Sequence, residues 1–83
     1  MLVLYNLDNS FIKITEEFPD NFTGIIEWPD GSKEWCTDDK LHRLDGPAFI
    51  DLDGKKHWYI HDEEVTEIEC KLLHDIMKLK GML

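Results

Sequence analysis

The sequence predicts an α+β domain: an antiparallel β-meander of consecutive hairpins, about six strands in all, with one C-terminal amphipathic helix. Three observations predict it. Alternating hydrophobic residues are broken by turn residues, a strand–turn–strand unit recurs, and the pattern takes a helical period after residue 65. Because 83 residues leave room for one domain, we assign 1–22 to an N-terminal hairpin and loop, 23–65 to two hairpin repeats and 66–81 to the helix.

The N-terminal hairpin is predicted from two short β-prone runs. The apolar stretch MLVLYNL is followed by the turn-like LDNS, and FIKIT then alternates between two faces. The next stretch, EEFPDN, combines a proline with clustered acids, which is typical of a loop.

An internal repeat at an offset of 23 residues is the clearest feature of the chain. WPDGSKEWCTD (28–38) aligns with DLDGKKHWYIH (51–61), and the strands that precede them, 23–28 and 46–51, also align. Each unit reads as strand, Asp-Gly turn and strand. If both turns are two-residue loops, Ile26 lies opposite Trp35 and Phe49 lies opposite Trp58.

The C-terminal segment has a helical period. Thr66 followed by Glu69 fits a capping box, and Gly81 fits a helix stop. We expect the apolar stripe of this helix to pack on one face of the β-meander, because the hairpins alone bury little surface. The stripe consists of Ile68, Leu72, Leu73, Ile76, Met77 and either Leu79 or Lys80.

The segment DGSKEW…KLHRLDGPAFIDLDGKKHWYI resembles a short β-hairpin repeat of uncharacterised bacteriophage and large-virus proteins, which is loosely similar to MORN-like arrays. The resemblance covers residues 23–65 and implies a phage-encoded hairpin array without an assigned activity. Two departures stand out: Asp38-Asp39 replaces the usual Asn-Gly, and HDEEVTE replaces the basic run after the second unit. We therefore expect the array to stop there, with the helix as its cap.

The stretch KLHRLDGPAF (40–49) could be a chemical site or a connector between the repeats, and the sequence favours the connector. Asp45-Gly46-Pro47 is a turn sequence, and Pro47 suits the start of a strand, where no ladder donor is needed. We expect His42 and Arg43 to hold the turn by hydrogen bonds to Asp45 or to backbone carbonyls.

Composition restricts the classes of partner. Eighteen acidic residues against nine basic ones give a formal net charge of −9, which disfavours direct binding to nucleic acid or to an anionic membrane. The charge allows either simple solubility or attraction to a basic protein surface. Only two cysteines, Cys36 and Cys70, and a first segment without a basic region predict a reduced, cytoplasmic protein.

No motif predicts an enzyme, a metal site or a cofactor. His57 and His61 share a strand face, and Cys36, Asp51 or Asp62 could supply a third ligand, but the close paired spacing of zinc sites is missing. Cys36 with His57 could form a nucleophile and base, although a strand cysteine beside Trp35 more often packs in a core. The chain also lacks a glycine-rich phosphate loop.

The acidic loops give the main functional hypothesis. Carboxylates standing in for phosphates would let a phage-encoded protein occupy the basic surface of a host protein, as an anti-CRISPR inhibitor of a defence nuclease would. Trp28 and Tyr59 could anchor such a partner. The acidic candidates are Glu16, Glu17, Asp20, Asp38, Asp39, Asp62, Glu63 and Glu64.

Two alternatives remain open for the same residues. The acids could simply solubilise their loops. The repeats could also form an assembly module, in which the helix, with Met77 and Met82, makes a homodimer seam.

Overall fold

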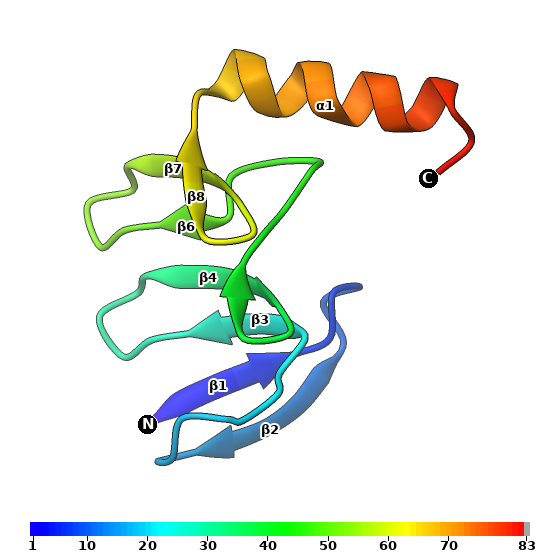
Figure 1. Ribbon diagram of the computed structural model, residues 1–83. Coiled ribbons are helices and arrows are strands. Elements are labelled where there is room, and N and C mark those ends of the chain that lie inside the picture. Colours follow the sequence, from blue (N-terminus) through cyan, green and yellow to red (C-terminus); the bar gives the residue numbers. More distant parts are fainter. Residues whose placement is uncertain (83) are drawn as a thin grey trace.

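The computed structural model describes residues 1–82 and shows an antiparallel β-meander of eight strands with one C-terminal helix (Figure 1). The predicted fold class is confirmed. The elements are β1 (Leu2–Tyr5), β2 (Phe11–Thr15), β3 (Gly24–Glu27), β4 (Lys33–Thr37), β5 (Lys40–Leu41), β6 (Phe49–Ile50), β7 (Lys56–Ile60), β8 (Glu63–Val65) and α1 (Glu67–Leu79).

The sheet has the strand order β2-β1-β3-β4-β6-β7-β8, and β5 pairs with β4 beside this path. The predicted N-terminal hairpin is therefore β1 and β2, and β1 also pairs with β3. Strands β3 and β4 form the first repeat hairpin, and β6 and β7 form the second.

Each repeat contains a third strand that the sequence did not reveal, which is why eight strands stand where about six were expected. Strand β5 follows β4, and β8 follows β7, each after a two-residue turn. Both residues of each turn have positive φ, as in type I′ turns: 49° and 67° at Asp38 and Asp39, 48° and 68° at His61 and Asp62. The two turns lie 23 residues apart and have nearly equal backbone angles, so the structural repeat continues past the residues that match in sequence.

The expected pairing across the Asp-Gly turns is wrong by one residue. Each loop contains three residues: the N–H of Trp28 donates to the carbonyl of Ser32, and that of Asp51 donates to Lys55. The loop glycines have left-handed φ, as in a type I turn closed by a bulge. The extra residue shifts the register, so that Trp35 lies opposite Ile25, and Phe49 lies opposite His57.

The hydrophobic core is small and lies on one face of the first half of the sheet. Leu2, Leu4, Ile26 and Cys36 form it, and the half-buried Phe22 and Trp28 pack against it. Phe22 belongs to the loop that follows β2, so this loop covers the face that the strands leave open.

Helix α1 begins and ends as its sequence predicts. The hydroxyl of Thr66 accepts from the N–H of Glu69, and the Glu69 carboxylate accepts from the N–H of Thr66. At the other end, Gly81 donates to the carbonyl of Lys78 and Met82 donates to that of Met77, which is a Schellman motif.

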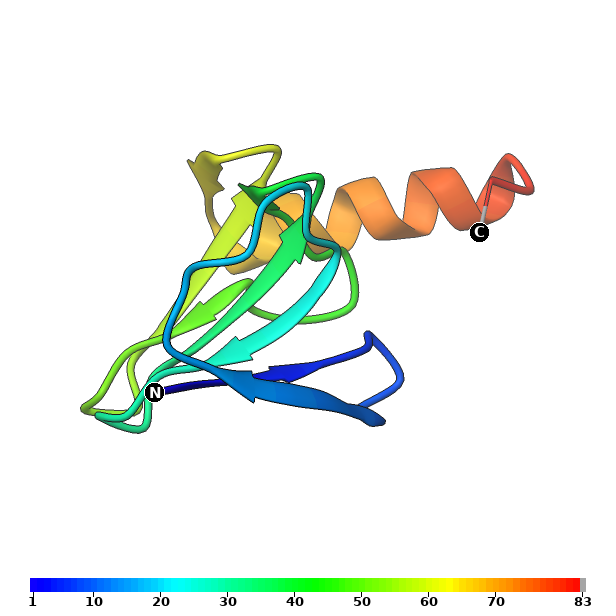
Figure 2. The ribbon, with the colours of Figure 1, turned by 90° about the horizontal axis from the view of Figure 1, so that it is seen from below.

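The expected packing of the helix stripe is wrong. Cys70 is buried, Leu73 and Met77 are half-buried and face the body, and the remaining apolar side chains point to solvent. The cause is that the helix carries two apolar stripes on different sides, of which only one can face the sheet. Figure 2 shows that the C-terminal half of α1 projects past the strands. The exposed residues are Ile68, Leu72, Ile76 and Leu79.

Replacing Gly24 by alanine tests the close approach of β3 to β1. A Cβ at Gly24 would lie 2.3 Å from the carbonyl oxygen of Tyr5 and 2.6 Å from Cζ of Phe22. We expect Gly24→Ala to lower the free energy of unfolding by about 3 kcal/mol, measured by urea denaturation.

Gly31→Ala is the matched control. A Cβ at Gly31 meets no atom within 4 Å, so only its left-handed φ is strained and the expected cost is about 1 kcal/mol. Equal costs for the two variants would contradict the strand contact.

Candidate functional site

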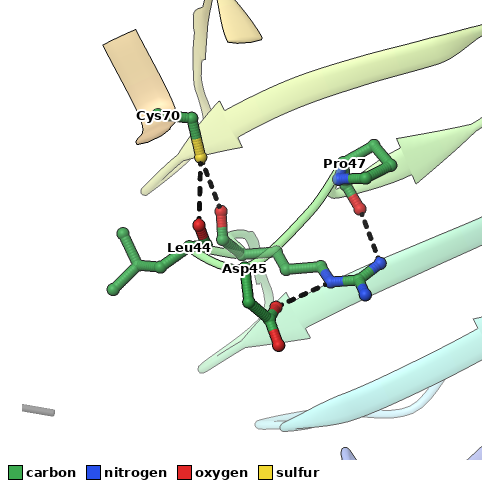
Figure 3. Close-up of polar contacts among 5 residues, drawn as sticks. Leu44, Asp45, Pro47 and Cys70 are labelled. Atoms are coloured by element: carbon green, nitrogen blue, oxygen red, sulfur yellow. Dashed lines mark hydrogen bonds and ion pairs between the residues drawn. The ribbon is translucent and has the colours of Figure 1, made fainter. Parts of the chain in front are cut away.

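The connector of residues 40–49 is held by Arg43, as the sequence predicts. Its Nε donates to a carboxylate oxygen of Asp45 at 2.9 Å, and its Nη1 donates to the carbonyl of Pro47 at 3.1 Å (Figure 3). The guanidinium also lies 4.3 Å from the ring centroid of Trp35, a cation–π distance. A Cβ at Gly46 would lie 2.8 Å from the guanidinium carbon, so a side chain there would displace Arg43 from these contacts.

Helix α1 is attached to this connector through Cys70. Its Sγ donates to the carbonyl oxygens of Arg43 and Leu44, at 3.3 and 3.5 Å (Figure 3). Burial raises the pKa of the Cys70 thiol, and burial raises that of Cys36 to about 12. Both thiols are unbridged and buried. They are therefore packed neutral groups rather than reactive nucleophiles.

His42 does not donate to Asp45 or to a carbonyl as expected. Its Nδ1 accepts from the backbone N–H of His61 at 3.2 Å, and the two rings stack with centroids 4.3 Å apart. Burial, followed by the charge of His61, lowers the pKa of His42. The ring therefore joins the connector to the β7–β8 turn as a neutral acceptor.

Both ring nitrogens of His57 contact carboxylates, so His57 is not placed in the metal site that was considered with His61. Its Nε2 lies 3.1 Å from Asp51, and its Nδ1 lies 3.5 Å from Glu64. The contact with His57 lowers the pKa of the Asp51 carboxyl. Within residues 1–82, no group of three or more histidine, cysteine or acidic side chains is placed to hold a metal ion.

Two of the predicted binding acids serve the fold. The carboxylate of Asp39 accepts from the N–H groups of Asn21 and Phe22, both at 2.7 Å, and that of Asp62 accepts from Leu41 at 2.7 Å. Each aspartate also donates its own N–H back, to the carbonyls of Phe22 and Leu41 respectively. Asp39 therefore holds the β4–β5 turn against residues 21–22, and Asp62 holds the β7–β8 turn against Leu41.

The remaining predicted acids do not form one continuous stripe. Glu16 and Glu17 follow Thr15, which pairs with Leu2 at the side of the sheet where the Asp-Gly loops lie (Figure 1). The type I′ turns lie at the opposite side, and there Asp38, Glu63 and Glu64 are exposed. Asp20 is also exposed and lies next to Asn21, which contacts Asp39.

The two aromatic candidates are half-buried rather than free. The indole N–H of Trp28 donates to the Glu34 carboxylate, and its ring lies 6.0 Å from that of Phe18. Tyr59 pairs with Glu64 across β7 and β8, and its carbonyl accepts from Arg43. Neither presents a full aromatic face to a partner.

A cleft of about 400 Å³ lies between the connector, β4 and α1. Trp35, Arg43 and His74 line it. The Trp35 ring is already covered by the guanidinium, and Arg43 is already paired with Asp45, so neither side chain is free to bind a ligand in this cleft.

The surface feature that the sequence pattern did not separate from the rest of the helix is the solvent-facing side of α1. We call it the outer face, and it consists of Ile68, Leu72, Ile76 and Leu79. The signal was present as spacings of four, four and three residues, which place these side chains on one side of a helix. It was hidden because Leu73 and Met77 were assigned to the same stripe.

Comparison with protein-family models, with curated proteins and with solved structures finds no match for this chain. Among residues 1–82, no helix has the length and hydrophobicity needed to span a bilayer.

The role of Asp39 can be tested by Asp39→Asn, with Asp38→Asn as the matched control. Both asparagines tolerate left-handed φ. We expect Asp39→Asn to lower the free energy of unfolding by about 2 kcal/mol, because it weakens two charge-assisted hydrogen bonds, and Asp38→Asn to change it by less than about 0.5 kcal/mol. Chemical denaturation measures both, and equal stabilities would refute a structural role for Asp39.

Proposed function

We propose that the protein is a non-catalytic assembly module that self-associates through the outer face of α1. The single observation that carries the proposal is the exposure of four large aliphatic side chains in one row on a capped helix. Ile68, Leu72, Ile76 and Leu79 are 71, 56, 48 and 88% exposed. A row of this kind is typical of interaction surfaces, whereas single exposed hydrophobic residues are common on any protein.

The free energy available at this face is substantial. Full burial of one leucine or isoleucine side chain contributes about 1.5–3 kcal/mol, so even partial burial of four per copy offsets much of the cost of association. The helix is also preformed, because the capping box and the Schellman motif hold both of its ends. Little ordering entropy is therefore lost on binding.

The other exposed apolar strand is a weaker candidate. Phe11, Ile12 and Ile14 of β2 are exposed at the sheet edge. Lys13 stands at the middle of this strand, and a central lysine is a common device against edge-to-edge pairing.

The proposal predicts that Leu72→Glu abolishes self-association. A buried carboxylate in the seam would be left unpaired, whereas the folded monomer keeps it in water. Sedimentation velocity from about 10 µM to 1 mM should show a concentration-dependent dimer for the natural sequence and a monomer for the variant.

Leu52→Glu is the matched control, because Leu52 is also exposed, at 65%, but lies in the Asp-Gly loop of the second unit. It should dimerise as the natural sequence does. A natural sequence that stays monomeric at 1 mM would overturn the proposal.

A second function is favoured by the acids on the side of the sheet that holds the type I′ turns. With Asp39 and Asp62 engaged in the fold, Asp38, Glu63 and Glu64 remain exposed there on a chain of net charge −9. We propose that this acidic side contacts a partner protein with a basic surface, which is how a phage-encoded inhibitor of a host defence protein would act without turnover. Electrostatic complementarity of this kind mainly raises the association rate and the specificity.

Paired charge reversals test this second function. Glu63→Lys with Glu64→Lys should abolish retention of a partner from host lysate, and Glu16→Lys with Glu17→Lys, which changes the net charge equally on the other side, should not. Mass spectrometry after washes at low salt and at about 0.5 M salt identifies the partner, which should leave at high salt. Equal retention by both variants would contradict an acidic binding site.

A further inference from the structure

We infer that two copies of this chain pair antiparallel along α1, with their outer faces in contact about a two-fold axis. The inference rests on the proposed self-association and adds the orientation of the helices and the contacts between them. It is carried by the distribution of charge along the two margins of the outer face.

The outer face is nearly symmetric about its own middle. Its four side chains run from Ile68 to Leu79, about 16 Å along the helix axis. If a second helix lies antiparallel, Ile68 meets Leu79 of the second copy, and Leu72 meets Ile76 of the second copy. Every large side chain of the row then faces another aliphatic side chain.

The margin on one side of this row alternates in charge. A residue that precedes a row member by one position lies about 100° to one side of it. Four charged residues stand in these positions, in the order acid, base, acid, base: Glu67, Lys71, Asp75 and Lys78. Reversing that order gives base, acid, base, acid, so an antiparallel copy places an opposite charge beside each of them.

The other margin is also self-complementary in the antiparallel arrangement. It carries Glu69 near the helix start and Lys80 near its end, so each meets its opposite on the second copy. In antiparallel pairs each margin meets the same margin of the partner, as in antiparallel coiled coils.

A parallel pair is disfavoured by the same charges. It would bring one margin of each helix against the other margin of its partner, at equal height. Glu67 would then lie beside Glu69, and Lys78 beside Lys80, which places like charges at both ends of the seam. The helix dipoles would also be aligned unfavourably.

Two of the flanking side chains, Glu67 and Lys71, are exposed enough to make these contacts, whereas the Glu69 carboxylate also accepts from the N–H of Thr66. The side chains of Lys71 and Glu67 are 72 and 51% exposed and form a 3.4 Å surface ion pair with each other. A seam of two 13-residue helices is short, so we expect a concentration-dependent dimer of the kind formed by small, transient interfaces.

Disulfide trapping tests the orientation. Ile68→Cys protein is mixed with Leu79→Cys protein under mild oxidation, and the native thiols do not interfere because Cys36 and Cys70 are 4 and 1% exposed. An antiparallel seam should give predominantly mixed 68–79 disulfides, identified by mass spectrometry of the cross-linked peptides.

The other outcomes separate the two proposals. Disulfides of 68 with 68 and of 79 with 79 would overturn the antiparallel orientation and leave self-association through α1 intact. A protein that sediments as a monomer at 1 mM would overturn both. A dimer that forms no disulfide at either position would also overturn both, because another surface would then hold it.

Charge exchange provides an independent measurement. Lys71→Glu and Asp75→Lys should each raise the dissociation constant about fivefold, because each places two like-charged pairs across the seam. The double variant should return it to within about twofold of the natural value. Circular dichroism checks that helix content is unchanged, and a double variant as weak as the singles would contradict the antiparallel contacts.

Discussion

Two strands share one edge of strand β4. The rest of the structure depends on how that edge is divided between them. Strand β5 pairs with its last residues and β6 with its first. The division falls at Trp35, whose N–H donates to Ala48 and whose carbonyl accepts from His42. The chain must therefore leave the edge of β4 after His42 and return to it before Ala48. In this excursion, Arg43 contacts Trp35, Asp45 and Pro47 and so fixes its shape. Helix α1 is attached to the same excursion, because Cys70 donates to the backbone carbonyls of Arg43 and Leu44.

The second unit has the same two hairpins as the first, but a helix rather than another β-strand follows its last strand, β8. At the repeat offset of 23 residues, Thr66 stands where the first unit has Arg43, and the helix begins where the first unit forms its connector. Helix α1 meets the body chiefly through Cys70, Leu73 and Met77. The small core around Leu4 and Ile26 lies on the first half of the sheet, so no part of it reaches the outer face of α1. This uncovered face is the direct consequence of a helix that ends a hairpin array.

The hairpins, the repeat and the helix with its caps could be predicted from the sequence, because Asp-Gly turns, alternation and the Thr66–Glu69 box are local signals. The register could not, since an Asp-Gly pair fits both a two-residue loop and the observed three-residue loop, and the choice depends on contacts such as Asp30 with Ser32. Which stripe of the helix is buried depends on where β8 ends, because the end of β8 fixes the position of Thr66 and of the first helical turn. The roles of Asp39 and Asp62 had a signal: an aspartate in the left-handed turn position that glycine usually occupies.

The outer face of α1 is covered, in the self-association proposed above, by the same face of a second copy of the chain. The most direct test is an isotope-filtered nuclear Overhauser experiment on a 1:1 mixture of labelled and unlabelled protein at about 1 mM. We expect intermolecular cross-peaks between methyl groups of Ile68 and Leu79, and between those of Leu72 and Ile76. Methyl signals of these residues that show no intermolecular cross-peaks, and that do not shift between about 20 µM and 1 mM, would contradict it.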